Sequence, residues 1–170
     1  MENGSVIVFN HMFSKIEKTA YPPNTKPVFI WDGECGFCKF WVVRLKIHTK
    51  NKIAYRTYQE AAGQFPDIPV KEFKKASRLI EVNGGIYSGP DSLYRSLQHA
   101  ENIVWPWHRW YYRYVWFTKV SDHGYFFIAK NRPMMFKLTK VLFGERPEKL
   151  KLYWLIYIVV IFVLAAMIFS

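Results

Sequence analysis

The two cysteines of the 170-residue chain, Cys35 and Cys38, stand at a C-x-x-C spacing, and no other cysteine is present. They lie between an apolar run at 28–31 and a helix-like stretch from Lys39 to about His48. A strand, a short turn and a cysteine at the start of a helix form the layout of a redox site, because a helix N-terminus stabilises a thiolate. We therefore take residues 32–38 as the predicted active site.

The chain after residue 27 alternates between strand and helix patterns. Asn83-Gly84-Gly85 is a typical hairpin turn, and it joins two of the expected strands. A strand, helix and strand in close succession favour a right-handed parallel crossover, which places Cys35 at the carboxyl edge of the sheet. The order β-α-β-α-β-β-α is that of a minimal thioredoxin fold, so an α/β, thioredoxin-like domain is predicted. The expected strands are 28–31, 53–58, 76–82 and 86–88, and the expected helices are 39–48, 59–64, 70–75 and 90–97.

The segments outside this domain have different compositions. Residues 1–26 are interpreted as an N-terminal arm, with a short amphipathic helix expected at 12–19. The thioredoxin-like core is placed at 27–100, and an aromatic and basic helical extension at 101–147. Helical spacing puts several rings of this extension on one face: Trp107, Trp110, Tyr111, Tyr114 and Phe117. A second helical pattern runs from about Tyr125 to Phe143, with Pro133 expected to kink or divide it.

The C-terminal segment has the composition of a membrane span. Leu152 to Phe169 is eighteen residues without a charge, or ~27 Å of helix, against about 30 Å of hydrocarbon core. Tyr153, Trp154 and Tyr157 resemble an interfacial aromatic belt, and basic residues exceed acidic ones just upstream. We therefore predict a single-pass C-terminal transmembrane helix with the folded domain facing the cytoplasm. The alternative is a buried core helix, and no secretory signal is expected at the start of the chain.

The charge and the aromatic content restrict the class of partner. The formal net charge is +11, which indicates an acidic partner such as nucleic acid, an anionic membrane or an acidic protein. Aromatic residues make up 19% of the chain and argue against disorder. Aromatic and arginine side chains at 105–117 are also typical of nucleic-acid stacking, but no RNA-binding signature accompanies them. We therefore expect interfacial or core packing for this stretch, and no nucleic-acid partner.

Three motifs in order carry a family resemblance. They are Asp32-Gly33-x-Cys35-x-x-Cys38 after an apolar strand, Tyr87-Ser88-Gly89-Pro90-Asp91-Ser92, and Ile128-Ala129-Lys130-Asn131-Arg132. Over about residues 27–143 the chain resembles the DCC family of thiol-disulfide oxidoreductases. The resemblance implies a thioredoxin-like fold and a dithiol/disulfide activity with Cys35 and Cys38 as the redox pair. Thioredoxins proper place a cis-proline before the third strand, whereas this chain has Lys75-Ala76 there.

Each cysteine has an expected role. Cys35, nearer the start of the helix, should have the lowered pKa and attack, while Cys38 should resolve the mixed disulfide. One alternative is a pair of inert thiols. The other is a zinc site, which needs two further ligands, and the five histidines show no paired spacing. No metal and no cofactor is therefore predicted.

The remaining site predictions concern polar and apolar neighbours of the cysteines. Asp32 either takes a proton from Cys38 or accepts hydrogen bonds from the amides that open the helix. Gly36 and Phe37 are expected to form the backbone and the apolar surface that a substrate meets. Asp91 is interpreted as a helix cap in preference to a substrate-binding residue. Asn131 and Arg132 are expected to pack or to cap a helix.

These predictions together describe a membrane-anchored oxidoreductase. It would exchange electrons with a protein or small thiol substrate through Cys35 and Cys38, resting as the dithiol and acting as a reductant in a reducing cytoplasm. The alternative is a non-catalytic thioredoxin-like binding module that docks an integral membrane protein through its aromatic helices.

Overall fold

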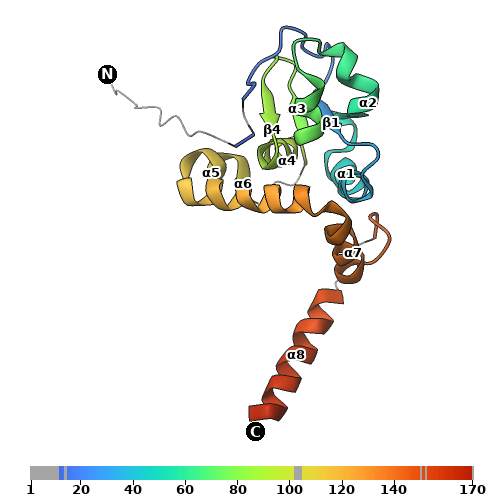
Figure 1. The fold of residues 1–170 in the computed structure, drawn as a ribbon, viewed down its shortest axis with the longest axis vertical. Helices are drawn as coiled ribbons and strands as arrows, with labels where there is room; N and C mark the ends of the chain where they lie inside the picture. The colour runs from blue at the N-terminus through green and yellow to red at the C-terminus, as the bar shows by residue number, and fades with distance from the viewer. Residues whose placement is uncertain (1–11, 14, 102–104, 150, 152, 170) are drawn as a thin grey trace, which may run out of the picture.

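A four-stranded sheet organises the first part of the chain (Figure 1). The computed structural model describes residues 12–13, 15–101, 105–149, 151 and 153–169. The strand order is β2-β1-β3-β4, with β1 parallel to β2, β1 antiparallel to β3, and β3 antiparallel to β4. This mixed sheet is compatible with a thioredoxin-like fold. The strands are β1 (Val28–Trp31), β2 (Ala54–Thr57), β3 (Arg78–Ile80) and β4 (Ile86–Ser88).

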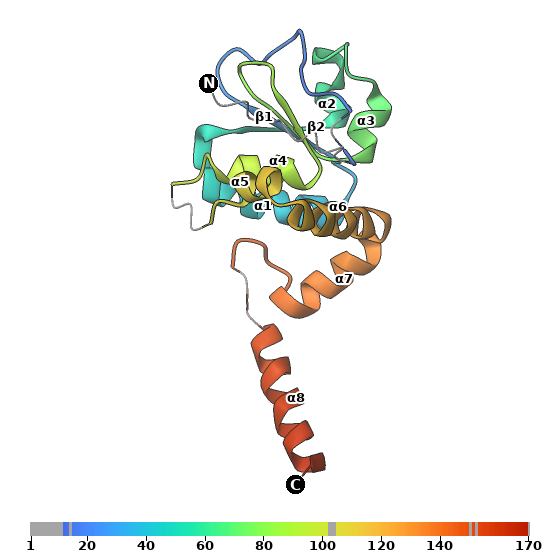
Figure 2. The same cartoon turned by 90° about the vertical axis from the view of Figure 1, so that its left-hand side faces the viewer.

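Eight α-helices are described besides two short 3-10 helices at Lys50–Lys52 and Ala62–Gln64. In Figure 2, α2 and α3 lie on one side of the strands and α1 and α4 on the other, while α8 extends away from the sheet. The helices are α1 (Gly36–Thr49), α2 (Tyr58–Ala61), α3 (Val70–Lys75), α4 (Pro90–Leu97), α5 (Trp107–Arg113), α6 (Val115–Lys130), α7 (Arg132–Phe143) and α8 (Tyr153–Phe169).

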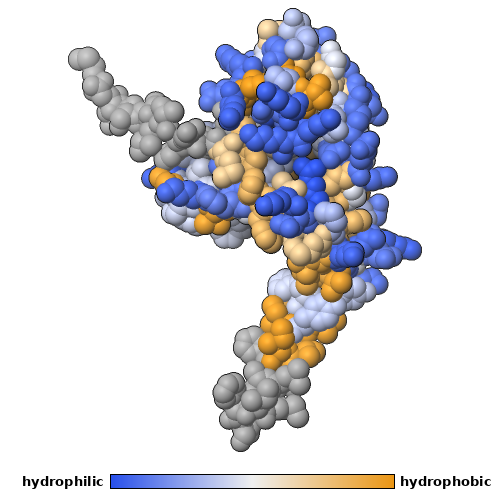
Figure 3. All heavy atoms as spheres, viewed as in Figure 1, coloured by the Kyte–Doolittle hydropathy of each residue, from blue (hydrophilic) through white to orange (hydrophobic). Residues whose placement is uncertain are grey.

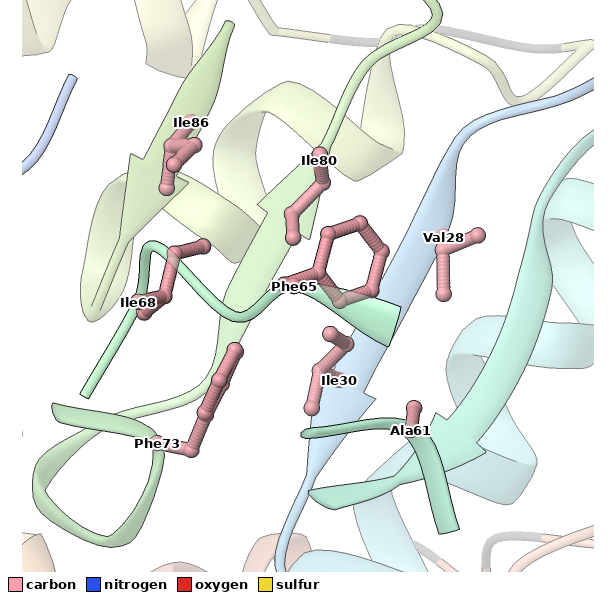
Figure 4. Close-up of a cluster of buried hydrophobic side chains, with 8 residues drawn as sticks. All are labelled: Val28, Ile30, Ala61, Phe65, Ile68, Phe73, Ile80 and Ile86. Carbon is pink, nitrogen blue, oxygen red and sulfur yellow. The ribbon is translucent and has the colours of Figure 1, made fainter. Parts of the chain in front are cut away.

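The alternation of side chains along β1 produces two hydrophobic clusters. Val28 and Ile30 point to the α2–α3 side, where they pack with Phe65 and Phe73 (Figure 4). Phe29 points to the opposite side and packs with residues of α1 and β3, namely Val42, Leu45 and Leu79. Because successive side chains of a strand face opposite ways, a continuous apolar run is the sequence of a strand covered on both faces. The apolar run therefore explains why β1 lies in the centre of the sheet, between β2 and β3. The strand starts and ends where the sequence predicts.

The N-terminal segment differs from its prediction. Its described residues between 12 and 19 form no helix. Instead, Lys18 forms a β-bridge with Gly85, and the Thr19 amide donates to the Gly84 carbonyl at 3.0 Å. Gly84 has φ 82°, in the left-handed region, and an added Cβ would stand 2.8 Å from the Thr19 carbonyl oxygen. Backbone pairing with the hairpin turn thus replaces the weak local helical preference.

The aromatic residues at 107–117 were expected to share one face of a helix, but the structure divides them between two helices, α5 and α6. Tyr114 adopts an extended conformation (φ −116°, ψ 111°) between α5 and α6. The Thr118 hydroxyl donates to the Tyr111 carbonyl across this turn. The rings still meet, since Trp107 and Phe117 stack at 5.9 Å between centroids. Pro133 divides the next pattern as predicted: α6 ends at Lys130 and α7 begins at Arg132.

The last helix, α8, is 17 residues long. Apolar residues gather over α7 and the first part of α8 in Figure 3, whereas hydrophilic residues cover much of the sheet-bearing part of that face. Among the helices of the described chain, none has both the length and the apolar character that crossing a membrane requires. The predicted transmembrane helix is therefore not supported.

Candidate active site

Cys35 occupies the first turn of α1, directly after β1. It is the N-cap of α1, and its Sγ accepts a hydrogen bond from the Cys38 amide at 3.2 Å. Helix α1 begins at Gly36, three residues before the predicted start, because the sulfur of Cys35 satisfies an amide that has no partner within the helix. Both cysteines are free thiols and half-buried. The start of the helix therefore holds Cys35 where a negative sulfur is favoured.

The pKa values of the two thiols are shifted in opposite directions. The hydrogen bond from the Cys38 side chain is the main cause that lowers the pKa of Cys35 to about 6, against a partial desolvation that raises it. The Cys38 amide and the positive charge of Arg132 lower the same pKa further. The pKa of Cys38 is raised, chiefly by its hydrogen bond to Cys35 and then by burial. At neutral pH, Cys35 is the thiolate and Cys38 the proton donor of the pair.

An ion pair joins this turn to α7. The Arg132 Nη1 atom lies 2.9 Å from Asp32 Oδ2, and both side chains are less than a quarter exposed. The other carboxylate oxygen of Asp32 accepts from the Glu34 amide at 3.2 Å and from Gln59 Nε2 at 3.3 Å. Burial lowers the pKa of Arg132, but the charges of the two cysteines, Tyr125 and Asp32 together outweigh it and raise that pKa overall. Arg132 therefore stays a cation beside the thiols.

Two hollows flank the C-x-x-C turn. The first, here called the open hollow, has a volume of about 450 Å³ and lies on the Cys35 side. The second, here called the apolar cavity, has a volume of about 320 Å³ and lies on the Cys38 side. Asp32, Phe37 and Arg132 line both. The open hollow is completed by Glu34, Cys35, Gly36, Ala129, Lys130, Pro133 and Phe136.

A comparison with protein-family models identifies the arrangement. The model described as DCC1-like thiol-disulfide oxidoreductase matches residues 29–138, which include both cysteines, Asp32 and Arg132. The chain belongs to this family. No curated protein and no solved structure matched the chain.

Helix α7 closes the site in this DCC1-like chain. An added Cβ on Gly36 would stand 2.8 Å from Phe136 Cε1, so the absence of a side chain at Gly36 lets the ring lie over the start of α1. Phe37 packs toward Trp41, with 6.3 Å between ring centroids. Gly36 and Phe37 thus line the open hollow beside Cys35, and their contact with a substrate stays a prediction.

Asp91 lies outside the site. It is fully buried within the first turn of α4, and its carboxylate is bonded to α5, with His108 Nδ1 at 2.6 Å and the Tyr112 hydroxyl at 2.7 Å. The N-cap of α4 is Gly89, whose φ of 61° suits a glycine. The structure does not bring Asp91 to either hollow beside the cysteines.

The sequence reading missed the electrostatic role of Arg132. Asn131 and Arg132 belong to the third family motif, but a packing or capping role was expected for both. Asn131 follows the expectation more closely, since its Nδ2 donates to the Phe127 carbonyl at 2.8 Å. The only sequence signal for Arg132 was the motif itself, because one hundred residues separate it from Asp32.

Ser77 adjoins the position that holds a proline in thioredoxins. Its amide donates to the Tyr125 hydroxyl at 3.0 Å, and its own hydroxyl lies 3.0 Å from the same oxygen. Ser77 and Tyr125 both line the apolar cavity. Within the described residues no peptide bond is cis. Tyr125 of α6 therefore fixes the backbone at Ser77, which lines the apolar cavity together with Cys38.

Proposed function

We propose that the chain is a thiol-disulfide oxidoreductase that works through Cys35 and Cys38. The observation that carries the proposal is the pairing of an acidic thiol at the N-cap of α1 with a protonated thiol one turn inside. Inert structural thiols are usually buried in apolar surroundings that raise their pKa. Cys35 has the lowered pKa of a nucleophile.

The proposed exchange has two steps. The Cys35 thiolate attacks a substrate disulfide, forms a mixed disulfide and releases one substrate sulfur as a thiolate, which takes a proton. Cys38 then loses its proton and attacks the Cys35 sulfur. This second step releases the other substrate thiol and leaves the Cys35–Cys38 disulfide, so two electrons pass to the substrate.

Asp32 and Arg132 have complementary roles in these steps. Arg132 favours the Cys35 thiolate before the attack. Asp32 lines the cavity wall together with Cys38, and its charge raises the pKa of Cys38. The carboxylate is therefore placed to receive the Cys38 proton directly or through a water molecule. Its hydrogen bond from Glu34 is a positioning contact made at the same time.

The open hollow is the proposed docking place for the substrate. Cys35 lies in its wall together with Lys130, so a protein or small thiol substrate reaches the nucleophilic sulfur from this side. In a reducing compartment the pair rests as a dithiol and reduces its substrate. The cytoplasmic location and the attachment to a membrane remain predictions from the sequence, and the described length of α8 does not support a membrane span.

A trapping experiment tests the activity. Cys38→Ser should accumulate mixed disulfides because resolution is lost, and Cys35→Ser should lose all turnover because the nucleophile is lost. The chain has no other cysteine, so the double serine variant is a complete control. If the wild-type chain forms no Cys35–Cys38 disulfide at any ratio of reduced to oxidised glutathione, the proposal is wrong.

The alternative function, a binding module, has a distinct outcome. Exposed aromatic residues of the extension, such as Trp105 and Trp116, are 52% and 63% exposed and offer a contact surface. If the double serine variant captures the same membrane protein as the wild type, with the same affinity, binding does not need the redox pair. That result would favour the binding module.

A further inference from the structure

The apolar cavity beside Cys38 is large enough to hold a small molecule. Its volume of about 320 Å³ is in the lower range of small-molecule sites. Helices α1, α4, α6 and α7 supply most of its wall. Aromatic and aliphatic side chains predominate in it, among them Phe37, Trp41, Leu93, Ile128, Leu138 and Leu142. Such a lining favours an apolar, ring-bearing occupant.

Trp41 contributes an unused hydrogen-bond donor. Its indole Nε1 is buried and, among the described residues, has no hydrogen-bond partner. The ring packs edge-on against Phe143 and Phe40, at 5.8 and 5.6 Å between centroids. A buried donor without a partner costs about 1–3 kcal/mol. Trp41 lines the cavity, so a carbonyl oxygen on a bound molecule would satisfy this donor once the indole turns its N–H toward the cavity.

The polar end of the cavity restricts the charge of the occupant. Asp32 and Arg132 are already bonded to each other there, so their charges balance. A carboxylate ligand would face the Asp32 carboxylate and lose its own hydration. A neutral carbonyl compound has neither cost.

The position of Cys38 restricts the chemical class of the molecule that the cavity would bind. It lies in the wall of the apolar cavity, whereas Cys35 lies in the wall of the open hollow. The redox pair therefore meets two different surroundings, one suited to a thiol substrate and the other to an apolar molecule. An apolar molecule that exchanges two electrons with a dithiol, and carries carbonyl oxygens on a flat ring, is a quinone.

We propose that the apolar cavity binds a lipophilic quinone, which exchanges electrons with the Cys35–Cys38 pair. This proposal rests on the proposed dithiol/disulfide function and adds a second substrate class to it. In the balanced step the Cys35 thiolate and the Cys38 thiol form one S–S bond and lose two electrons and the proton of Cys38, while solvent supplies a second proton. The two carbonyl oxygens of the quinone gain those protons and electrons and become the hydroxyls of a quinol.

The exposed side of α7 offers an entry from an apolar phase. Leu138 lines the cavity and is 43% exposed, and its neighbours one turn away, Met134 and Val141, are 51% and 53% exposed. A quinone dissolved in lipid or detergent thus reaches the cavity along apolar side chains.

The test uses the full-length chain in detergent with a decyl-substituted benzoquinone, under anaerobic conditions. The reduced wild type should convert the quinone to the quinol, read by its absorbance, while the Cys35–Cys38 disulfide appears by mass. Binding is measured separately by equilibrium dialysis on the double serine variant, which cannot react. Exchange with oxidised glutathione is measured on separate portions of the same reduced wild-type preparation.

Two substitutions in the wall of the cavity and one outside it give the contrast. Trp41→Phe keeps a ring but removes the N–H, so quinone binding should weaken about fivefold to tenfold. Leu142→Trp fills the space and should abolish binding. Trp110→Phe, whose residue lies in the aromatic cluster of α5 and α6, should leave binding unchanged. Folding of each variant is verified by its urea midpoint.

The outcomes separate the two proposals. If the wild type exchanges with glutathione but neither binds nor reduces the quinone, the cavity proposal is wrong and the exchange function stands. If the wild type does not exchange with glutathione, the proposed function itself fails. If Leu142→Trp binds the quinone as tightly as the wild type does, the quinone is held by exposed apolar residues elsewhere, and the cavity proposal is again wrong.

Discussion

The acidity of Cys35 depends first on its neighbour in the same turn, and this can be measured. The pKa of Cys35 is lowered from 9.0 to about 6, and the largest cause is the hydrogen bond from the Cys38 side chain. Replacing Cys38 by alanine removes that donor. The pKa of Cys35 in Cys38→Ala should therefore be well above 6, while Cys38→Ser, which keeps an O–H donor, should stay close to the wild type.

The magnitudes decide which quantity to measure. At pH 7 a thiol with a pKa of about 6 is about 90% thiolate, whereas one with a pKa of 9.0 is about 1% thiolate. Nucleophilicity falls with pKa at a Brønsted slope of about 0.45, so three pKa units cost about 20-fold per thiolate. The net advantage in rate at pH 7 is then only about fourfold. The inflection of the pH profile is therefore a clearer readout than the rate at one pH.

The assay is alkylation of the reduced full-length chain with iodoacetamide from pH 4.5 to 10, with the modified cysteine identified by mass. Wild-type Cys35 should show an inflection near pH 6, and Cys38 should stay unmodified until much higher pH because its pKa is raised. The inflection in Arg132→Gln should move up by less than in Cys38→Ala, since the charge of Arg132 is a smaller cause. An inflection near pH 6 in Cys38→Ala would refute the argument that the thiol–thiol hydrogen bond dominates.

Three further predictions concern stability. The unfolding free energy of the reduced chain should rise from pH 6 to 9, because Cys35 has a lower pKa in the folded than in the unfolded chain. The contribution of Cys35 is complete above pH 9, where the raised pKa of Cys38 begins to act in the opposite direction, and it is lost as pH falls to 6. The rise should be absent from the urea midpoints of the disulfide form and of Cys35→Ser. Asp91→Ala should cost about 3 kcal/mol of unfolding free energy, because it removes a fully buried carboxylate that is bonded to His108 and accepts a hydrogen bond from Tyr112. The inflection of Cys35 should stay near pH 6, and a shifted inflection would place Asp91 at the site. Arg78→Met should cost about 3 kcal/mol, since it leaves Glu72 buried without its cation 2.7 Å away, and the double change Arg78→Met with Glu72→Gln should recover part of this in urea titrations.

Local patterns were sufficient to predict the four strands and the order of strands and helices along the chain. The run at 28–31 became the central strand β1, because a strand covered on both faces has no polar alternation to obscure it. The turn at 83–85 fixed the hairpin, although β3 is shorter than predicted, at three residues. The C-x-x-C motif after a strand placed Cys35 at the N-terminus of α1 and Cys38 in its first turn. All of these signals lie within a few residues of what they predict.

Features that depend on distant segments were not predictable in the same way. The ion pair between Asp32 and Arg132 joins residues one hundred positions apart, and no periodicity encodes such a contact. The pattern at 12–19 is compatible with a helix, but pairing of Lys18 with Gly85 decides its conformation. Likewise, the position of Asp91 at the start of a helix suggested that its side chain caps that helix. In the folded chain its carboxylate is bonded to residues of α5 instead.

The ion pair between Asp32 and Arg132 also has a consequence for biosynthesis. A ribosome adds Arg132 one hundred residues after Asp32, so the nascent chain carries its cysteines for some time without the guanidinium and without α7 over Gly36. During that interval no helix from the later part of the chain contributes to the acidity of Cys35. The contribution of Arg132 to the acidity of Cys35, which is smaller than that of Cys38, is therefore added only when most of the chain has been made.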